Sequence, residues 1–172
     1  EREQKEDIPL FATASLQHLL FNDQACQDFN VAAKVYPPLG SKADQEALLS
    51  ALESGLLSAL TSSDNLQSYM SKDQPFAEAS YGVAIAEYLL PLAYHYFVVP
   101  KRITFEKMVS LLSKAPAQLM GFDMLGEIAV GKRANFVLFD PEGQTEMEDN
   151  GLYSSVILKG KVISSWINGV SE

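Results

Sequence analysis

Cysteine and histidine are both scarce in this sequence. The single cysteine, Cys26, excludes a disulfide within the chain and favours a reducing, cytoplasmic setting. Nothing near Cys26 in the sequence resembles the base that activates a catalytic thiol. The two histidines, His18 and His95, lie far apart, and no cysteine or histidine pair has the spacing of zinc ligands.

Positive charge and long apolar runs are also lacking. Lys and Arg number 13 against 22 Asp and Glu, which gives a formal net charge of −9 at pH 7. Such an acidic chain repels phosphate backbones and anionic lipids, so we expect neither a nucleic-acid nor a membrane partner. The apolar stretch YLLPLAYHYFVV (88–99) is shorter than the ~18 residues of a membrane span, and Pro91 and His95 interrupt it.

The first part of the chain alternates strand and helix patterns. Short apolar runs predict three strands, over residues 8–15, 31–36 and 56–61. Ser41 and Asp44 have the spacing of a capping box that opens a helix over 42–54, and Gly55 is placed to end it. This strand–helix–strand order favours a parallel sheet covered by helices.

Two further helices follow. Segment 81–97 is apolar almost all round, which predicts a buried helix that is kinked or broken near Pro91. Thr104 can cap a second helix over 105–114. The next residues, APAQLMG, predict a short turn that ends at Gly121.

The pattern changes near residue 122. The segments GEIAVGKRANFVLFDPEG and SSVILKGKVISSWINGV alternate apolar with polar residues and contain glycine and Asp-Pro. Such segments form antiparallel strands and hairpins. We therefore expect an α/β part over residues 1–122 and a small β domain over residues 123–172.

Several separated segments resemble, in order and spacing, the C-terminal part of dihydroorotases of the amidohydrolase superfamily. They are KVYPPLGSKADQEALLSAL, PFAEASYGVAIAEYLLPLA, LLSKAPAQLMGF, GEIAVGKRANFVLFDP and LKGKVISSWINGV. The resemblance runs from about Pro9 to Gly169. It implies an α/β fold, namely the C-terminal part of a (β/α)8 barrel of a metal-dependent hydrolase, with a small antiparallel β domain. In such barrels the active site lies at the C-terminal ends of the strands.

The three predicted strands resemble strands six to eight of that barrel. Three strands cannot close a barrel, and the first of them would expose an unpaired edge. We therefore interpret the chain as a fragment. Its missing partner is the N-terminal half of the barrel, from the same polypeptide or from another chain.

The resemblance also implies one or two zinc ions that activate a water to attack a cyclic amide. Most of the zinc ligands are histidines on early strands, which this chain does not contain. One ligand is a histidine at the end of strand six, and Gln17 stands at that position. An amide is a poor zinc ligand beside imidazole. His18 occupies a position that does not coordinate metal in the family, so packing or a hydrogen bond is its expected role.

The end of strand eight is altered as well. The family has an aspartate there that ligates metal and shuttles the proton. Ser63 aligns with this aspartate, Asp64 with the histidine after it, and Gln67 with a second histidine that contacts substrate. Asp64 can replace the aspartate only through a bulge or a shifted register, because a one-residue slip turns a side chain to the opposite face. A capping or turn role is the alternative for Asp64.

The substrate-orienting positions differ in the same way. Tyr36 and Gly40 stand where the family has an asparagine and an arginine, whereas Gly82 is retained. The positions that bind metal, act as the base or bind substrate in the family therefore all carry different residues in this chain. They are Gln17, Tyr36, Ser63 and Gln67.

These departures predict a non-catalytic dihydroorotase homologue that needs no cofactor in this chain. Inactive members of the family are structural partners of aspartate carbamoyltransferase, so the resemblance implies a scaffolding role in pyrimidine biosynthesis. One alternative is an active zinc-dependent cyclic-amide hydrolase, whose other ligands lie in the missing half and whose base is Asp64 or comes from a partner chain. Another is a binding protein that uses the old pocket for a different small molecule. A homo-oligomer also remains open.

Overall fold

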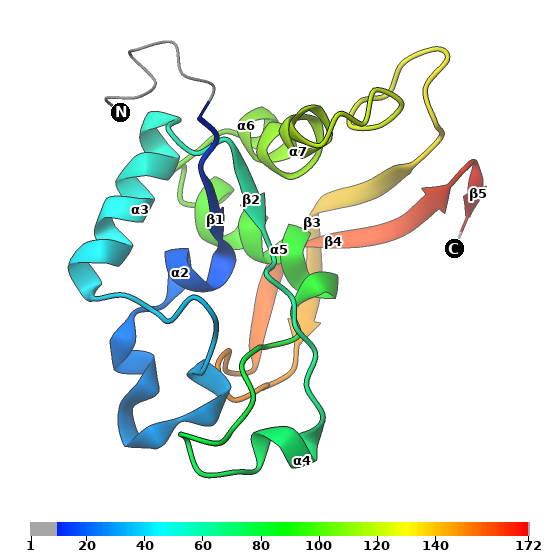
Figure 1. Cartoon of the computed structure of the whole chain (residues 1–172). Helices are drawn as coiled ribbons and strands as arrows, with labels where there is room; N and C mark the ends of the chain where they lie inside the picture. Colours follow the sequence, from blue (N-terminus) through cyan, green and yellow to red (C-terminus); the bar gives the residue numbers. More distant parts are fainter. Residues whose placement is uncertain (1–9, 172) are drawn as a thin grey trace.

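Two short parallel strands lie at the centre of the computed structural model, which describes residues 10–171. Strand β1 (Thr13–Ser15) pairs directly with β2 (Ala59–Thr61) in parallel. Figure 1 shows helix α3 and the small sheet on opposite sides of this pair. Both strands are shorter than predicted, and residues 8 and 9 of the first predicted strand lie outside the described range.

Helix α3 (Lys42–Ser54) spans the residues that the sequence predicted. The Ser41 hydroxyl accepts a hydrogen bond from the Asp44 N–H, and the Asp44 carboxylate accepts one from the Ser41 N–H at 2.8 Å. This reciprocal pair is the predicted capping box. Gly55 ends the helix in a left-handed conformation, with φ +81°.

Replacing Gly55 by alanine is expected to lower the free energy of unfolding by about 1 kcal/mol, because an L-residue is strained at this φ. A new Cβ would meet only the Lys107 Nζ, at 3.7 Å, so backbone strain is the main cost. Urea unfolding of the complete polypeptide measures the change. An unchanged midpoint would contradict the left-handed cap.

The strand predicted over residues 31–36 is wrong. Its first half is a short 3-10 helix, η2 (Val31–Ala33), which Asn30 caps by accepting a hydrogen bond from the Ala32 N–H at 3.0 Å. Ala33 and Val35 are nevertheless buried, so the apolar pattern reflects packing in the core and not pairing in a sheet. As a consequence, β1 and β2 are direct neighbours.

The helix predicted over residues 81–97 begins later, since residues 81–85 are not helical. It consists of three consecutive segments: η3 (Ala86–Tyr88), α5 (Leu89–Ala93) and the π-helical turn η4 (Tyr94–Val98). The helix changes from 3-10 to α at Leu89, two residues before Pro91, and the kink or break predicted near Pro91 stays a prediction. Pro91 lies in the first turn of α5, where an N–H has no partner within the helix. In the described range, no helix has the length and apolarity to cross a membrane.

Thr104 caps the next helix as predicted, with its hydroxyl accepting a hydrogen bond from the Lys107 N–H at 3.2 Å. This helix consists of α6 (Phe105–Val109), the π-helical turn η5 (Ser110–Lys114) and α7 (Ala115–Leu119). The turn predicted over APAQLMG is therefore wrong as far as Leu119. Pro116 is the second residue of α7, just after η5, where the hydrogen-bond register of the helix already changes. Gly121 follows with φ +68°.

The C-terminal strands are antiparallel, as predicted. They are β3 (Phe136–Met147), β4 (Val156–Ile167) and β5 (Val170–Ser171), paired in that order. This sheet packs on the helices, with the rings of Tyr94 and Phe139 5.2 Å apart. Gly160 permits this approach, because a Cβ there would come within 2.8 Å of the Tyr94 ring. Met147 and Leu158 belong to the same core cluster as Leu16, Leu52 and Leu92 of the α/β part. The domain boundary near residue 122 stays a prediction.

Candidate functional site

The C-terminal ends of β1 and β2 are joined by the predicted metal position, Gln17. Gln17 lies in the short helix α2 (Leu16–Leu20), directly after β1, and is only 1% exposed. Its Nε2 donates a hydrogen bond to the backbone oxygen of Ser62, which follows β2, at 2.6 Å. Its Oε1 is buried and has no hydrogen-bond partner among residues 10–171. The amide of Gln17 therefore links the ends of the two strands.

Both ring nitrogens of His18, the residue after Gln17, form hydrogen bonds. Its Nδ1 lies 2.6 Å from the Ser15 hydroxyl and its Nε2 lies 3.0 Å from the Pro37 carbonyl oxygen. A carbonyl oxygen can only accept, so Nε2 carries a proton, and in the neutral ring Nδ1 accepts from the Ser15 hydroxyl. This geometry matches the hydrogen-bonding role expected of His18.

Ser63 and Asp64 are both exposed, in the loop after β2. Ser63 adopts a left-handed conformation with φ +44°, and its N–H donates to the Thr61 hydroxyl at 3.0 Å. The Oδ1 of Asp64 accepts hydrogen bonds from the N–H groups of Ile85 and Ala86, at 2.5 and 2.8 Å. Ile85 directly precedes the helical segment 86–98, and Ala86 is its first residue. This is the geometry of the capping alternative for Asp64.

Gly82 and Gln67 both lie against Asn65. Gly82 is buried with φ +133°, and its N–H donates to the Lys34 carbonyl oxygen at 2.9 Å. A Cβ on Gly82 would come within 2.7 Å of the Asn65 Cβ, and closer still to the Asn65 carbonyl oxygen. The Gln67 amide donates to Asn65 Oδ1 at 2.8 Å. A close approach of two backbone segments is therefore enough to require glycine at position 82.

Tyr36 and Gly40, the other two predicted substrate positions, have different neighbours. Tyr36 is 75% exposed, and its ring packs edge-on against Tyr81 with the centroids 5.9 Å apart. Gly40 lies at the start of α3, where its carbonyl oxygen accepts from the Asp23 N–H at 2.8 Å. A side chain on Gly40 would come within 2.9 Å of Asp44 in the capping box.

A cleft of about 330 Å³ opens beside Gln67 and Gly82. Its walls include Val31, Leu66, Gln67, Lys72, Gly82 and Asn150. Neither Lys72 nor Asn150 is among the site residues predicted from the sequence. Lys72 ends a four-residue helix, α4 (Tyr69–Lys72), and Asn150 belongs to the loop between β3 and β4. No local motif marks either residue, because only the tertiary fold brings these two segments together.

Lys72 lines this cleft, and its ammonium contacts the backbone of a second lysine, Lys34. Lys34 is only 8% exposed, and its ammonium donates to the Phe76 and Ala77 carbonyl oxygens at 2.6 and 3.0 Å. The Lys72 ammonium donates to the Val31 carbonyl oxygen at 2.8 Å. It also lies 3.4 Å from the backbone carbonyl oxygen of Lys34. Burial and the neighbouring charge of Lys34 lower the pKa of Lys72. Neither ammonium forms an ion pair with a carboxylate in the described part of the chain.

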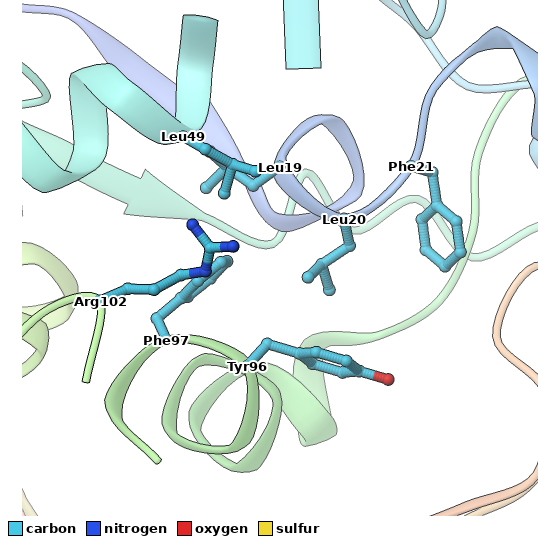
Figure 2. Close-up of a pocket in the computed structure, with 7 residues that line it drawn as sticks. All are labelled: Leu19, Leu20, Phe21, Leu49, Tyr96, Phe97 and Arg102. Carbon is cyan, nitrogen blue, oxygen red and sulfur yellow. The ribbon is translucent and has the colours of Figure 1, made fainter. Parts of the chain in front are cut away.

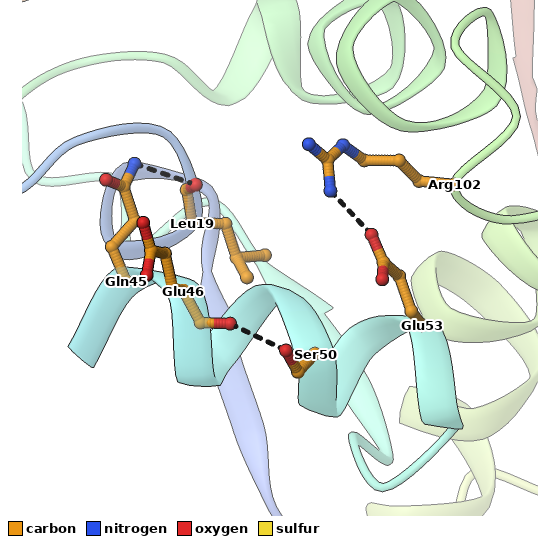
Figure 3. Close-up of polar contacts among 6 residues, drawn as sticks. All are labelled: Leu19, Gln45, Glu46, Ser50, Glu53 and Arg102. Carbon is orange, nitrogen blue, oxygen red and sulfur yellow. Dashed lines mark hydrogen bonds and ion pairs between the residues drawn. The ribbon is translucent and has the colours of Figure 1, made fainter. Parts of the chain in front are cut away.

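A smaller hollow of about 200 Å³ lies between α2, α3 and η4. Figure 2 shows its walls, formed by Leu19, Leu20, Phe21, Leu49, Tyr96, Phe97 and Arg102. The Arg102 guanidinium is paired with Glu53 at 2.5 Å, and Gln45 holds α3 to the Leu19 carbonyl oxygen at 3.2 Å (Figure 3). None of the predicted site positions lines this hollow.

The side chains at the predicted metal positions do not fit a zinc ion on their own. Within residues 10–171, no group of three or more His, Cys, Asp or Glu side chains is arranged to hold a metal. The amide of Gln17 is turned to a backbone carbonyl, and Ser63 offers only a hydroxyl. Zinc prefers imidazole, thiolate and carboxylate ligands.

The amidohydrolase family model matches residues 10–170. The chain belongs to the amidohydrolase family. A dihydroorotase-like protein of Pseudomonas aeruginosa is 35% identical over 142 residues, which is 83% of this chain and 33% of that protein. A dihydroorotase of Ruminiclostridium cellulolyticum is 28% identical over 165 residues, covering 91% of this chain and 38% of that protein. The resemblance to the C-terminal part of dihydroorotases is thereby confirmed.

Similar solved structures confirm the fold. The dihydropyrimidinase from Brevibacillus agri superposes with a TM-score of 0.89 at 25% identity, over 99% of this chain and 40% of that one. A D-hydantoinase from Thermus superposes with a TM-score of 0.88 at 20% identity, over the same shares. The chain thus spans about two fifths of these structures and has the predicted fold of a partial (β/α)8 barrel with a small antiparallel sheet.

Proposed function

We propose that this amidohydrolase chain is part of a non-catalytic dihydroorotase-like protein of pyrimidine biosynthesis, which acts as a structural partner of aspartate carbamoyltransferase. One observation carries the proposal. Gln17 and Asp64, which lie at or beside the predicted metal and base positions, are both committed to hydrogen bonds with the backbone.

Hydrolysis of a cyclic amide by this family needs an activated water and a carboxylate that accepts its proton. Asp64 is the carboxylate nearest in sequence to the predicted base position. To act as that base it would have to leave the N–H groups of Ile85 and Ala86, and Ile85 is buried. Leaving a buried N–H without a partner costs about 1–3 kcal/mol. The hydroxyl of Ser63 is not an adequate base near neutral pH.

The second candidate is an active zinc-dependent cyclic-amide hydrolase whose metal is held by residues outside this chain. The buried Oε1 of Gln17 favours it, because this oxygen lies at the strand ends without a hydrogen-bond partner in the described range. In this alternative Asp64, or a carboxylate of a partner chain, supplies the base. Turnover distinguishes the two candidates.

A mixing experiment tests the proposed partnership. The complete gene product that contains this chain is combined at micromolar concentration with aspartate carbamoyltransferase of the same organism, and the mixture is analysed by size-exclusion chromatography. We expect the two proteins to elute together and the carbamoyltransferase to unfold at a higher temperature in the complex. Separate elution of two folded proteins would contradict the proposed partnership.

A further inference from the structure

We propose that His95 is a pH-sensitive contact that holds strand β4 of the small sheet against the helical segment 86–98. The contact forms while the imidazole is neutral and is lost when the ring takes up a proton. The resemblance assigns no role to His95. The inference therefore goes beyond the proposed scaffolding function, and it holds whether or not the protein catalyses a reaction.

The first argument is the hydrogen bond that His95 makes. His95 lies in the π-helical turn η4 and is half-buried. Its Nδ1 accepts from the backbone N–H of Lys159 in β4 at 2.9 Å. A ring nitrogen can accept only when it carries no proton, so in the neutral ring the proton lies on Nε2. The two residues are 64 positions apart, and their hydrogen bond joins the helix to the small sheet.

The second argument is the place of this N–H in the sheet. Lys159 lies opposite Gln144 of β3, whereas β5 pairs only with Trp166 and Ile167 of β4. In the described part of the chain, β3 is thus the one strand beside β4 at Lys159. The imidazole of His95 takes the place of a second strand as the acceptor for this N–H. Protonation of Nδ1 would set two N–H groups against each other.

The third argument is the apolar character of the surrounding contact. β4 lies against α5 and η4 (Figure 1). The Tyr94 ring packs on Gly160 of β4 and on Phe139 of β3. Leu158 and Phe97 are almost fully buried. These contacts are made by backbone, apolar side chains and aromatic rings, so a proton on His95 changes one polar contact between the helix and β4. We therefore expect a local loosening of β4 and not unfolding of the whole chain.

The charges around His95 favour its neutral form. Burial and the positive charge of Lys159 lower the pKa of His95 from its ordinary value of 6.5. The Tyr96 ring packs edge-on against the imidazole at 4.8 Å. Helix α5 has no titratable residue. The other charged residues on the packed elements α6, β3 and β4 are Glu106, Lys107, Asp140, Glu142, Glu146 and Lys161. Within residues 10–171, none of their carboxylates forms an ion pair with His95.

The direction of the pH effect follows from this lowered pKa. A histidine that binds its proton less tightly in the closed structure stabilises that structure above its ordinary pKa. The stabilisation is lost as the pH falls through the pKa of the closed form. The contact between His95 and Lys159 should therefore be complete at about pH 7.5 and weakened at about pH 5.5.

Hydrogen–deuterium exchange of the complete gene product, followed by mass spectrometry, tests the contact. Exchange of peptides that contain Lys159 is compared at about pH 7.5 and about pH 5.5, after correction for the intrinsic rates. We expect the corrected exchange to be about fivefold faster at the lower pH, because a hydrogen bond is lost. His95→Asn retains an oxygen acceptor that does not titrate, so it should abolish this difference. His95→Leu removes the acceptor and should give fast exchange at both pH values.

His18→Gln is the matched control, because His18 is the other histidine of this chain and makes its hydrogen bonds with Ser15 and Pro37. This variant should retain the pH difference in β4. The proposal is overturned by equal corrected exchange at the two pH values in the unaltered protein, or by a pH difference that persists in His95→Asn. The unaltered protein and His95→Asn decide the case even if His95→Leu fails to fold, which circular dichroism would reveal.

Discussion

Replacing Gly82 by alanine is expected to lower the free energy of unfolding by about 3 kcal/mol. Two costs combine at this position. The backbone has φ +133°, a region that only glycine enters easily. In addition, the new Cβ would lie within 2.7 Å of the Asn65 Cβ, so the loop after β2 must move away from Gly82. Urea unfolding of the complete gene product measures the loss.

Gly121→Ala is the matched control. Gly121 also has a positive φ, +68°, but a Cβ there would meet no atom within 4 Å. Its replacement should therefore cost only backbone strain, about 1 kcal/mol. If both variants lost the same stability, the close approach of Gly82 to Asn65 would be disproved, and a role of Gly82 in substrate binding would regain support.

Removing the Asp64 carboxylate should be the second large effect. Asp64→Ala is expected to lower the free energy of unfolding by about 2 kcal/mol, because it strips the N–H groups of Ile85 and Ala86 of their acceptor at the start of a helix. Asp64→Asn retains one oxygen acceptor and should cost less. Thermal unfolding of the three proteins, recorded by circular dichroism at 222 nm, gives the ranking.

Asp73→Ala is the control for Asp64. Asp73 is also exposed and directly follows α4, but its carboxylate makes no hydrogen bond to another residue in the described range. Its loss should change stability by less than about 0.5 kcal/mol. If Asp64→Ala lost no more stability than Asp73→Ala, the capping role of Asp64 would be disproved. Asp64 would then again be a candidate base.

The sequence predicted those parts of the fold that depend on neighbouring residues. The capping box of Ser41 and Asp44 and the left-handed Gly55 are local features, because each involves residues within one turn of the helix. The cap at Thr104 is of the same kind. The hairpin strands β3 and β4 were recognisable because alternation and turn residues are also short-range signals.

Features that depend on tertiary contacts were missed. Residues 31–36 looked like a strand because Ala33 and Val35 are buried, but the loop at Gly82 and the Asn30 cap hold this segment out of the sheet. The hydrogen bonds of Asp64 reach a helix that begins more than 20 residues later, so alignment alone left two roles open for it. Lys72 and Asn150 come from distant segments, and no sequence motif joins them.

Turnover of dihydroorotate is the most direct test of the central claim, that this protein lacks the family's catalysis. The complete gene product is supplied with zinc, and ring opening and ring closure are each followed spectroscopically. We predict no rate above that of the uncatalysed reaction while the protein is folded. Zinc-dependent turnover that Asp64→Asn abolishes would contradict the claim and establish Asp64 as the base.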